Sequence, residues 1–371
     1  MRVALFYHSL VSDWNHGNAH FLRGFATELK ARGHEVRTYE PRSSWSRLHL
    51  VRQQGQAPLE AFRSAYPGMR SEAYTLSRLN LDAALEGVDL ALVHEWNDGR
   101  LVRRLGEYRA RSPRLRLLFH DTHHRSVTAP RQVPAQDLRD YDGVLAFGAV
   151  IRDLYLQRGW TQRAWTWHEA ADVRVFRPPP SPQPPAAELV WIGNWGDEER
   201  SRELRRFLIE PVGELGLRAT VHGVRYPARA RAELAAAGLD YRGWIANFEV
   251  PSVFAKHLVT VHVPRRVYAD RLPGIPTIRP FEAMACGIPL VSAPWDDSEG
   301  LFRPGTDHLV VRSKAEMKRR LRELVADPAQ RAQLAAEGLR TIRARHTCGH
   351  RVDQLLAIAA ELGAGGLEAV A

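Results

Sequence analysis

The sequence predicts an α/β protein of two doubly wound domains, each with a parallel sheet covered by helices on both faces. In both halves of the chain, short apolar runs alternate with segments whose apolar residues recur at helical spacing. A proline-rich segment, which can continue neither a helix nor an inner strand, separates the halves at residues 179–187. The length of 371 residues is sufficient for two separate cores.

The first half begins with a strand–loop–helix–strand unit. Arg2 to Phe6 form the predicted strand, and the helix carries its apolar residues on one face before Gly33 ends it. The loop between them places the N–H groups of Gly17 and Asn18 at the start of the helix, where an anion is favoured. This loop could therefore bind an anion, and the alternative is that its single glycine serves only the turn. Residues 45–74 are polar and rich in arginine, and we interpret them as a helical insertion.

Two later strands of this half end in polar clusters, at residues 94–97 and 120–124. Ligands of doubly wound sheets bind beyond the carboxyl ends of the strands, so both clusters are placed to reach one. His120 and Asp121 end the second of these strands, and one interpretation is that His120 is satisfied within a loop network. The spacing His-Asp-x-His-His is not typical of zinc ligands, so we predict no metal site.

Composition excludes several classes of protein. No apolar run is long enough to span a bilayer, and the first residues predict a core strand rather than a signal peptide. The two cysteines imply no disulfide framework, so we expect a cytoplasmic protein. The net charge of +10 reflects arginines spread along the chain, which argues against nucleic acid as the partner. A basic acceptor-side face and a peripheral contact with an anionic membrane stay open.

The predicted domains are residues 1–178 and 188–371, joined by the linker 179–187, and the last helix could pack back on the first domain. In the second half, the strand 189–192 leads into a loop that contains Gly193, Asn194 and Arg200. Arg200 can grip a diphosphate, or it can be an ordinary solvated residue. Arg265 and Arg266 form a second cationic cluster, which could bind phosphate.

The segment from Arg279 to Ser292 is the most informative part of the chain. Residues 281–286 predict a short helix, with Pro280 at its first turn and Gly287 at its C-terminal end, and residues 288–292 predict a buried strand. Glu282 is then the one ionised group on an apolar turn, and a buried carboxylate needs hydrogen-bond donors. The alternative is a solvated acid at a helix start.

The phrase Phe281-Glu-Ala-Met-Ala-Cys-Gly-Ile-Pro-Leu-Val291 closely resembles the donor-nucleotide motif of family-4-type glycosyltransferases with the GT-B fold. The resemblance implies two Rossmann-like domains facing a cleft, with Glu282 accepting hydrogen bonds from the ribose of a nucleotide-sugar. It also implies that His120 and Asp121 are the catalytic pair, with His120 contacting the donor sugar and Asp121 orienting it. The loop of Gly17 and Asn18 would then face the diphosphate and the acceptor. Around the nucleotide it places Arg279, Pro280, Phe281, Gly193, Asn194, Arg200 and Trp244.

One position departs from that family. Many relatives carry a second glutamate eight residues before the motif glutamate, where it holds the transferred sugar, and this chain has Gly274 there. The sequence around residues 263–282 looks more like the spore-maturation (CgeB-like) branch, in which the earlier glutamate is often absent.

From these observations we predict a glycosyltransferase of the hexosyltransferase type that acts in glycan biosynthesis. The donor would be a UDP- or GDP-linked sugar, no cofactor is expected, and the acceptor would be a glycan, lipid or protein hydroxyl. The resemblance implies a retaining reaction. The alternatives are a sugar-nucleotide epimerase of the same fold and a non-catalytic nucleotide-sugar-binding protein. DNA glycosylation is a weaker alternative that rests on charge alone.

Overall fold

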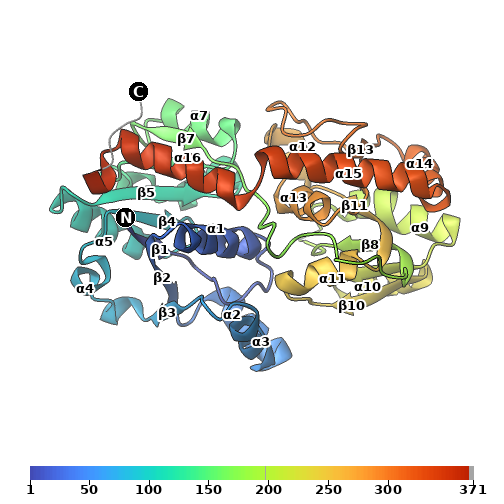
Figure 1. Ribbon diagram of the computed structural model, residues 1–371, viewed down its shortest axis with the longest axis horizontal. Coiled ribbons are helices and arrows are strands. Elements are labelled where there is room, and N and C mark those ends of the chain that lie inside the picture. The colour runs from blue at the N-terminus through green and yellow to red at the C-terminus, as the bar shows by residue number, and fades with distance from the viewer. Residues whose placement is uncertain (197, 367–371) are drawn as a thin grey trace. The chain divides into compact units, whose positions relative to one another are not determined.

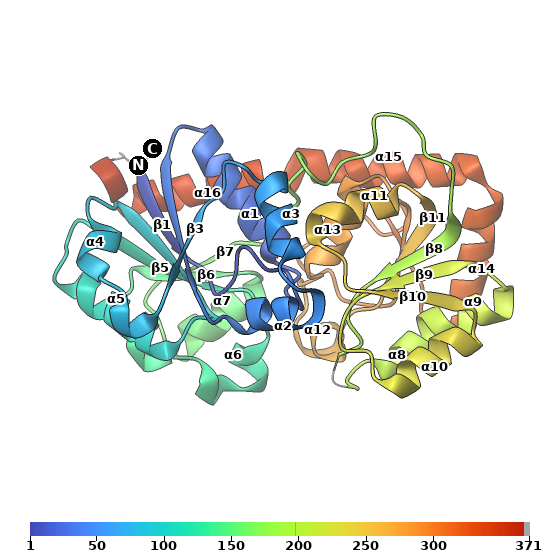
Figure 2. The same ribbon diagram turned by 90° about the horizontal axis from the view of Figure 1, so that it is seen from below.

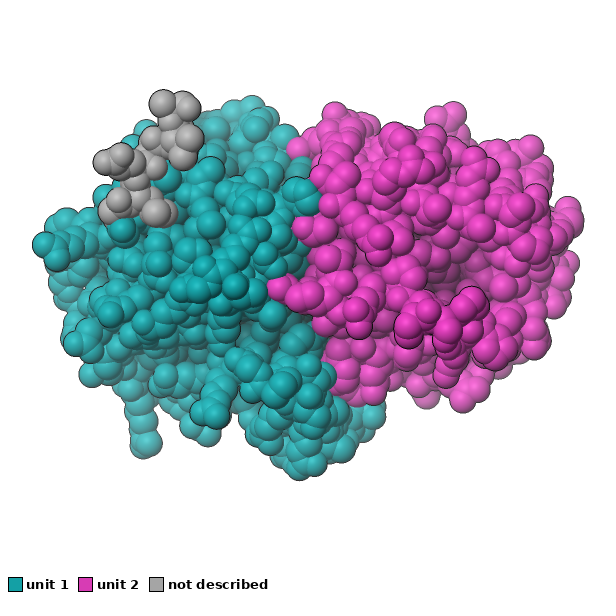
Figure 3. Space-filling model, in the orientation of Figure 1, with its two compact units in different colours: residues 1–169, 348–371 teal, residues 170–347 magenta. Residues whose placement is uncertain are grey.

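The computed structural model describes residues 1–196 and 198–366, and these residues form two compact units (Figure 3). Unit 1 consists of residues 1–169 and 348–371, and unit 2 consists of residues 170–347. Asp197 and the last five residues, which fall inside the predicted second domain, lie outside the described residues. No helix in the described part of the chain is long and apolar enough to cross a membrane.

Within the described residues, unit 1 contains a seven-stranded sheet in the order β3-β2-β1-β4-β5-β6-β7, with every pairing parallel. Its two middle strands, β1 and β4, pair from Val3 opposite Leu90 to Phe6 opposite Val93. The strands are β1 (Arg2–Phe6), β2 (Glu35–Pro41), β3 (Ser71–Tyr74), β4 (Leu90–His94), β5 (Arg116–Asp121), β6 (Gly143–Ala146) and β7 (Ala164–Thr166).

The helices of unit 1 lie on both faces of this sheet. Figure 2 shows α1 and α16 on one face and α5 and α7 on the other. α16, at the end of the chain, lies against α1, at its start (Figure 1). The helices are α1 (Ala19–Ala31), α2 (Trp45–Gln54), α3 (Ala57–Ala65), α4 (Leu81–Leu85), α5 (Gly99–Ala110), α6 (Arg125–Thr128), α7 (Ala149–Gln157) and α16 (Cys348–Glu361).

The described residues of unit 2 form a six-stranded parallel sheet in the order β10-β9-β8-β11-β12-β13. Its core is almost entirely apolar, with Leu189, Val221 and Val261 fully buried on three neighbouring strands. The strands are β8 (Ala187–Ile192), β9 (Ala219–His222), β10 (Leu239–Gly243), β11 (His257–His262), β12 (Leu290–Ser292) and β13 (Leu309–Val310).

Helices also cover both faces of the unit 2 sheet, with α13 and α15 on one face and α9 and α10 on the other (Figure 2). A five-residue π-helical turn, Arg205–Ile209, joins α8 to α9. The helices are α8 (Ser201–Leu204), α9 (Glu210–Leu215), α10 (Ala228–Ala236), α11 (Val250–Phe254), α12 (Arg266–Arg271), α13 (Ile278–Ala285), α14 (Lys314–Ala326) and α15 (Pro328–Arg345).

In each sheet the strand order reverses once, between β1 and β4 in unit 1 and between β8 and β11 in unit 2. At such a switch point the connections leave the two central strands toward opposite faces, which opens a crevice at their carboxyl ends. The predicted α/β class and doubly wound sheets are therefore confirmed. Each sheet contributes one place where a ligand is expected to bind.

The units differ from the predicted domain boundaries at two places. Residues 170–178 belong to unit 2, where Ala171 N–H donates to the carbonyl of His346 and Pro178 lies against Gly287. Residues 348–366 belong to unit 1, because α16 packs on α1. Residues 180–186 are exposed and form no helix or strand, and their role as a linker stays a prediction.

Candidate functional site

Arg200 lies at the switch point of unit 2. Its Nη1 donates to the carbonyl of Val263, just beyond β11, at 2.9 Å, and its Nη2 donates to the carbonyl of Asn194, just beyond β8. The guanidinium therefore spans the carboxyl ends of the two central strands. The Cζ atom of Arg200 also lies 5.3 Å from the ring centroid of Trp191. Burial lowers the pKa of Arg200 to about 10, which leaves it charged at neutral pH.

This placement gives the predicted phosphate-binding arginine a fixed position. Two carbonyl acceptors and an aromatic face hold the guanidinium, while its buried Nε–H has no hydrogen-bond partner in the described part of the chain. A planar guanidinium at a ligand-binding edge is suited to phosphate oxygens. The arrangement favours a diphosphate ligand over the alternative of a solvated surface residue.

Gly193 and Asn194 shape the turn beneath this arginine. Gly193 follows β8 directly, and a Cβ there would lie 2.5 Å from the ring of Trp191, so a larger residue would displace the tryptophan. The side-chain oxygen of Asn194 accepts the N–H of Val224 at 2.8 Å. Both predicted residues thus lie at the carboxyl edge of the sheet, and Asn194 uses its side-chain oxygen to hold the turn after β9.

Glu282 lies inside α13 and is completely buried. Its Oε2 pairs with Nη1 of Arg279, one turn earlier on the same helix. The residue before the helix, Thr277, has φ 63° and ψ −179°, a region that is almost restricted to glycine. A β-branched residue held in this conformation stores strain at the N-terminus of α13, as is common at ligand-binding sites. The solvated-acid alternative for Glu282 does not fit its burial.

The aromatic and proline residues of the predicted nucleotide site have different surroundings. Phe281 is buried and packs against Phe302 and His346, with ring centroids 5.2 and 5.5 Å away. Its side chain is therefore part of the core, and its assignment as a nucleotide contact stays a prediction. Pro280 is also buried in α13. Trp244 follows β10 and is half-buried, which is compatible with a ligand contact.

The predicted cationic cluster of unit 2 is paired. Nε of Arg265 lies 2.6 Å from a carboxylate oxygen of Glu199, and Nη2 of Arg266 lies 3.1 Å from Glu203. Because each guanidinium already has a carboxylate partner, these arginines carry less free positive charge than their spacing in the sequence suggests. Their assignment as phosphate ligands stays a prediction, and Arg200 is the better placed cation.

At the switch point of unit 1, a cluster of histidines follows the central strands. The rings of His8 and His94 stack at 5.3 Å, and the rings of His94 and His120 meet edge to face at 5.5 Å. Burial lowers the pKa values of all three imidazoles well below 6.5, that of His94 to about 3. The cluster is therefore neutral at physiological pH, and it was visible in the sequence only as residues at separate strand ends.

His120 has no hydrogen-bond partner on either ring nitrogen within the described residues. Its ring is enclosed by Trp167 at 4.8 Å and Phe21 at 6.2 Å. Asp121 makes its hydrogen bonds elsewhere: one carboxylate oxygen accepts Tyr155 Oη–H at 2.9 Å, and the other accepts the N–H of His123 at 3.0 Å. The catalytic role of the two residues stays a prediction. A buried imidazole with two unsatisfied nitrogens retains its full capacity to bind a ligand.

Two buried carboxyl groups lie beside these histidines. Burial, and then the neighbouring Glu95, raises the pKa of Asp121 to about 7, and burial raises the pKa of Glu95 to about 8. Glu95 accepts the hydroxyl of Thr122 at 3.2 Å and lies 2.8 Å from Nδ1 of His94. The cluster thus holds polar groups of low net charge, which suits neutral hydroxyls better than phosphates.

The remaining predicted residues of unit 1 are Gly17 and Asn18. Asn18 is the N-cap residue of α1, without a side-chain hydrogen bond to the helix, and both residues are half-buried. Their position at the start of α1 agrees with the predicted loop, while their ligand stays a prediction. Among residues 1–196 and 198–366, no group of three histidine, cysteine or acidic side chains is arranged to hold a metal ion.

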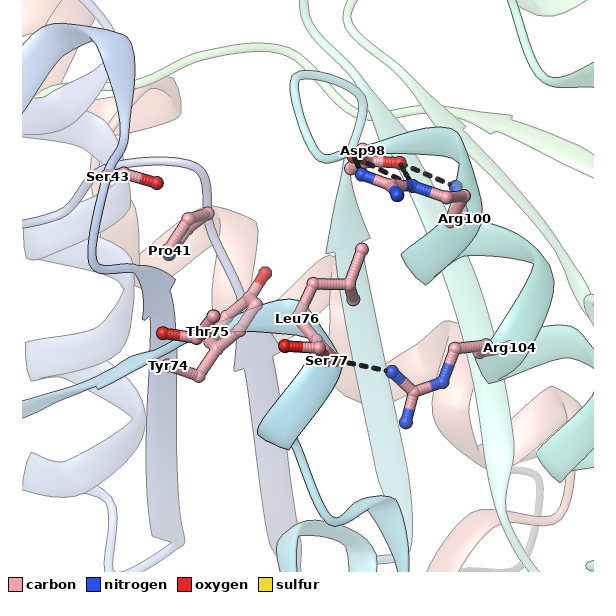
Figure 4. A pocket seen from close by; sticks show the side chains of 9 residues that line it. All are labelled: Pro41, Ser43, Tyr74, Thr75, Leu76, Ser77, Asp98, Arg100 and Arg104. Carbon is pink, nitrogen blue, oxygen red and sulfur yellow. Dashed lines mark hydrogen bonds and ion pairs between the residues drawn. The ribbon is translucent and has the colours of Figure 1, made fainter.

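A separate pocket of about 490 Å³ opens in unit 1 beside the carboxyl ends of β2 and β3 (Figure 4). At its rim Arg100 pairs with Asp98, while Arg104 donates to the carbonyls of Leu76 and Leu79. None of the residues predicted from the sequence lines it. Its lining residues are Pro41, Ser43, Tyr74, Thr75, Leu76, Ser77, Asp98, Arg100 and Arg104.

Comparisons with solved structures identify the fold. The chain is similar to HepE from Anabaena in complex with UDP and glucose, at 14% identity over 97% of this chain and all of that one, with a TM-score of 0.64. It is similar to an alpha-glucosyltransferase in complex with UDP and a 13-mer DNA containing a HMU base, at 14% identity over 97% and 99% of the chains and a TM-score of 0.71. T4 phage BGT in complex with UDP and Mn²⁺ gives 12% identity over 98% and 99% and a TM-score of 0.62.

These likenesses establish a GT-B-like architecture of two parallel-sheet α/β units. Residues 200–357, which include Arg200 and Glu282, match a family model described as glycosyl transferase-like. This match covers less than half of the chain, and it agrees with the glycosyltransferase class that the sequence predicts. No curated protein matches its sequence.

Proposed function

We propose that this protein transfers a sugar from a UDP-sugar to a hydroxyl group of an acceptor. The acceptor oxygen forms a bond to the anomeric carbon as the bond from that carbon to the diphosphate breaks. UDP leaves and takes up the proton that the hydroxyl loses. Negative charge grows on the leaving phosphate, so a fixed cation near it lowers the barrier. The placement of Arg200 across the switch point of unit 2 is the observation that carries this proposal.

The donor nucleotide binds to unit 2. Arg200 contacts the diphosphate. Gly193 and Asn194 form the turn after β8, whose backbone lies next to the Arg200 guanidinium. Glu282 accepts hydrogen bonds from the ribose hydroxyls, and its pairing with Arg279 orients the carboxylate. The bound UDP in three structures of the same fold supports uridine as the base rather than guanosine.

Unit 1 contributes to the sugar and the acceptor. The neutral cluster around His120 offers imidazole and carboxyl groups to sugar hydroxyls, without the charge that would attract a second phosphate. Gly17 and Asn18 contact the acceptor side of the diphosphate, and the pocket in Figure 4 provides serine, threonine and tyrosine hydroxyls for an extended acceptor. The acceptor class stays open, because one structure of this fold contains DNA and the sequence favours a glycan, lipid or protein.

Three finer features complete the proposal: retention of the anomeric configuration, membership of the spore-maturation branch and independence of a metal. The first two rest on the resemblance of the motif around Glu282. Independence of a metal rests on the predicted cations of unit 2. It needs a direct test, because the structure of T4 phage BGT holds Mn²⁺. Activity that persists in EDTA is the expected result, and loss that added Mn²⁺ restores would overturn metal independence.

A thermal-shift panel of UDP, GDP, ADP and their glucose conjugates tests the donor assignment. A ligand that binds only the folded protein raises the melting temperature. We expect UDP and UDP-glucose to raise it, and the other nucleotides to have little effect. Release of UDP from UDP-glucose is then measured with candidate acceptors. Consumption of the nucleotide-sugar without an acceptor product would indicate an epimerase, and binding without any turnover would indicate a non-catalytic protein.

A further inference from the structure

Two loops of unit 2 meet at Gly274. One follows β11 and leads to α13, and the other follows β12, so both lie at the carboxyl edge of the sheet. The N–H of Gly274 donates to the carbonyl of Asp296 at 2.7 Å and ties the loops together. A Cβ built at Gly274 would lie 2.4 Å from Oε1 and 2.7 Å from Cγ of Glu299. The carboxylate of Glu299 therefore fills the space in which a side chain at position 274 would begin.

The backbone on either side of Glu299 is held in place. The two carboxylate oxygens of Asp297 accept the N–H groups of Leu301 and Phe302 at 2.9 and 2.8 Å. Nη2 of Arg345 donates to the carbonyl of Gly300 at 3.0 Å. Glu299 lies in a turn and not in a helix. The loop instead presents a half-buried carboxylate in a position that its neighbours define.

A carboxylate at this position can bind some groups of a nucleotide-sugar and not others. A carboxylate repels the diphosphate, and the proposed site already supplies Arg200 for that group. Sugar hydroxyls are hydrogen-bond donors, and an ionised carboxylate accepts at about four lone-pair positions, so it can bind more than one of them. Gly274 lies only four residues before the start of α13, the helix that carries Glu282, so Glu299 lies in the same part of unit 2 as the donor residues.

We propose that Glu299 is a donor-sugar-binding residue, whose carboxylate accepts hydroxyls of the transferred sugar and whose position requires a glycine at 274. Gly274 has φ +81°, a conformation that side chains rarely adopt, and any side chain there would displace the carboxylate. The inference rests on the proposed function, because it assigns a substrate group within the same donor site.

Calorimetric titration with UDP and with UDP-glucose separates the sugar contact from the nucleotide contacts. Glu299→Gln keeps the shape of the side chain and removes its charge. We expect it to weaken UDP-glucose binding about ten-fold to one hundred-fold, and to change UDP binding by less than about two-fold. Asp296→Asn is the matched control: it removes an exposed charge from the same loop and should leave both affinities unchanged.

Gly274→Ala provides an independent test, because the added methyl group should push the carboxylate of Glu299 away without changing any charge. We expect the same selective loss of UDP-glucose affinity. Unchanged UDP-glucose affinity in a folded Glu299→Gln protein would overturn the inference, as would an equal loss for UDP and UDP-glucose with a lowered melting temperature. If the unaltered protein binds neither ligand, the proposed function itself fails.

Discussion

Arg279 and Glu282 form an ion pair within α13, between a guanidinium that is 15% exposed and a carboxylate that is fully buried. Arg279 is thus one of the hydrogen-bond donors that a buried carboxylate at position 282 was predicted to need, and a buried charge is stable only when it is compensated. A ribose bound to Glu282 would then share the carboxylate with Arg279.

We predict that Glu282→Gln weakens UDP binding by roughly ten-fold to a few hundred-fold and also lowers the stability of the free protein. The lost hydrogen bonds to a charged group account for about 1.5–3 kcal/mol of binding. Stability falls by a similar order, because the neutral amide leaves Arg279 without its counter-charge. Calorimetric titration with UDP measures the first effect, and urea unfolding measures the second.

The control for this variant is Glu323→Gln in α14. Glu323 pairs with Arg320 at the same i,i+3 spacing, at 2.9 Å, but its side chain is 36% exposed. Exposed pairs of this kind contribute about 1 kcal/mol or less, so stability should change little and UDP affinity not at all. A well-folded Glu282→Gln protein with unaltered UDP affinity would remove Glu282 from the donor site.

Arg200→Gln should weaken the binding of UDP by about ten-fold to one hundred-fold while leaving the weak binding of uridine unchanged. The reason is that Arg200 contacts the diphosphate in our proposal and neither the base nor the ribose. Competition assays with UDP and uridine give the two affinities. Arg202→Gln, which alters a side chain 79% exposed on the neighbouring turn, should affect neither. An equal loss of affinity for UDP and uridine would indicate that Arg200 only holds the strand ends together.

The carboxyl group of Asp121 should make stability depend on pH. Its pKa is 3.8 in an unfolded chain and about 7 here, so between these values the folded protein binds a proton that the unfolded chain has lost. Stability therefore decreases as pH rises through this window, by at most about 1.4 kcal/mol per pH unit for this group, and levels off above it. Glu95, whose pKa is also raised, acts in the same direction.

Asp121→Asn removes this titration and keeps an oxygen that can accept from Tyr155 or His123. The stability of the variant relative to the original protein should therefore increase from about pH 4 to pH 8. Urea unfolding of both proteins across that range provides the measurement, and other groups common to both largely cancel in the difference. Parallel stability curves would show that Asp121 is ionised throughout.

The sequence predicted the central strands and the motif helix because they carry strong local patterns. β4 and β5 are continuous apolar runs, and α13 has a proline near its start and a glycine after its end. The edge strands were harder to predict, since Ser71–Tyr74 and Ala164–Thr166 are short and only partly buried. Such strands are defined by pairing with a neighbour and not by their own composition.

The candidate site was predicted only where one short segment carries the signal, as with Glu282. The pairing of Arg265 with Glu199 joins residues 66 positions apart, and the contact of Glu299 with Gly274 joins two loops. Neither has a pattern in the sequence, because long-range contacts are set by the packing of whole elements. The histidine cluster was missed for the same reason: it arises only when β1, β4 and β5 lie side by side.

His120→Phe should separate ligand binding from stability in unit 1. Both ring nitrogens of His120 lack a partner in the described residues, while aromatic side chains surround the ring. Replacing an unsatisfied buried polar group by an apolar one of similar shape is nearly neutral or stabilising, so the melting temperature should stay the same or rise.

Transfer from UDP-glucose should fall by about ten-fold or more if the imidazole binds the sugar, since one to two hydrogen bonds are lost. His124→Phe, a change at a half-buried histidine nearby, serves as the control. A large fall in stability with unaltered turnover per folded molecule would make His120 a structural residue.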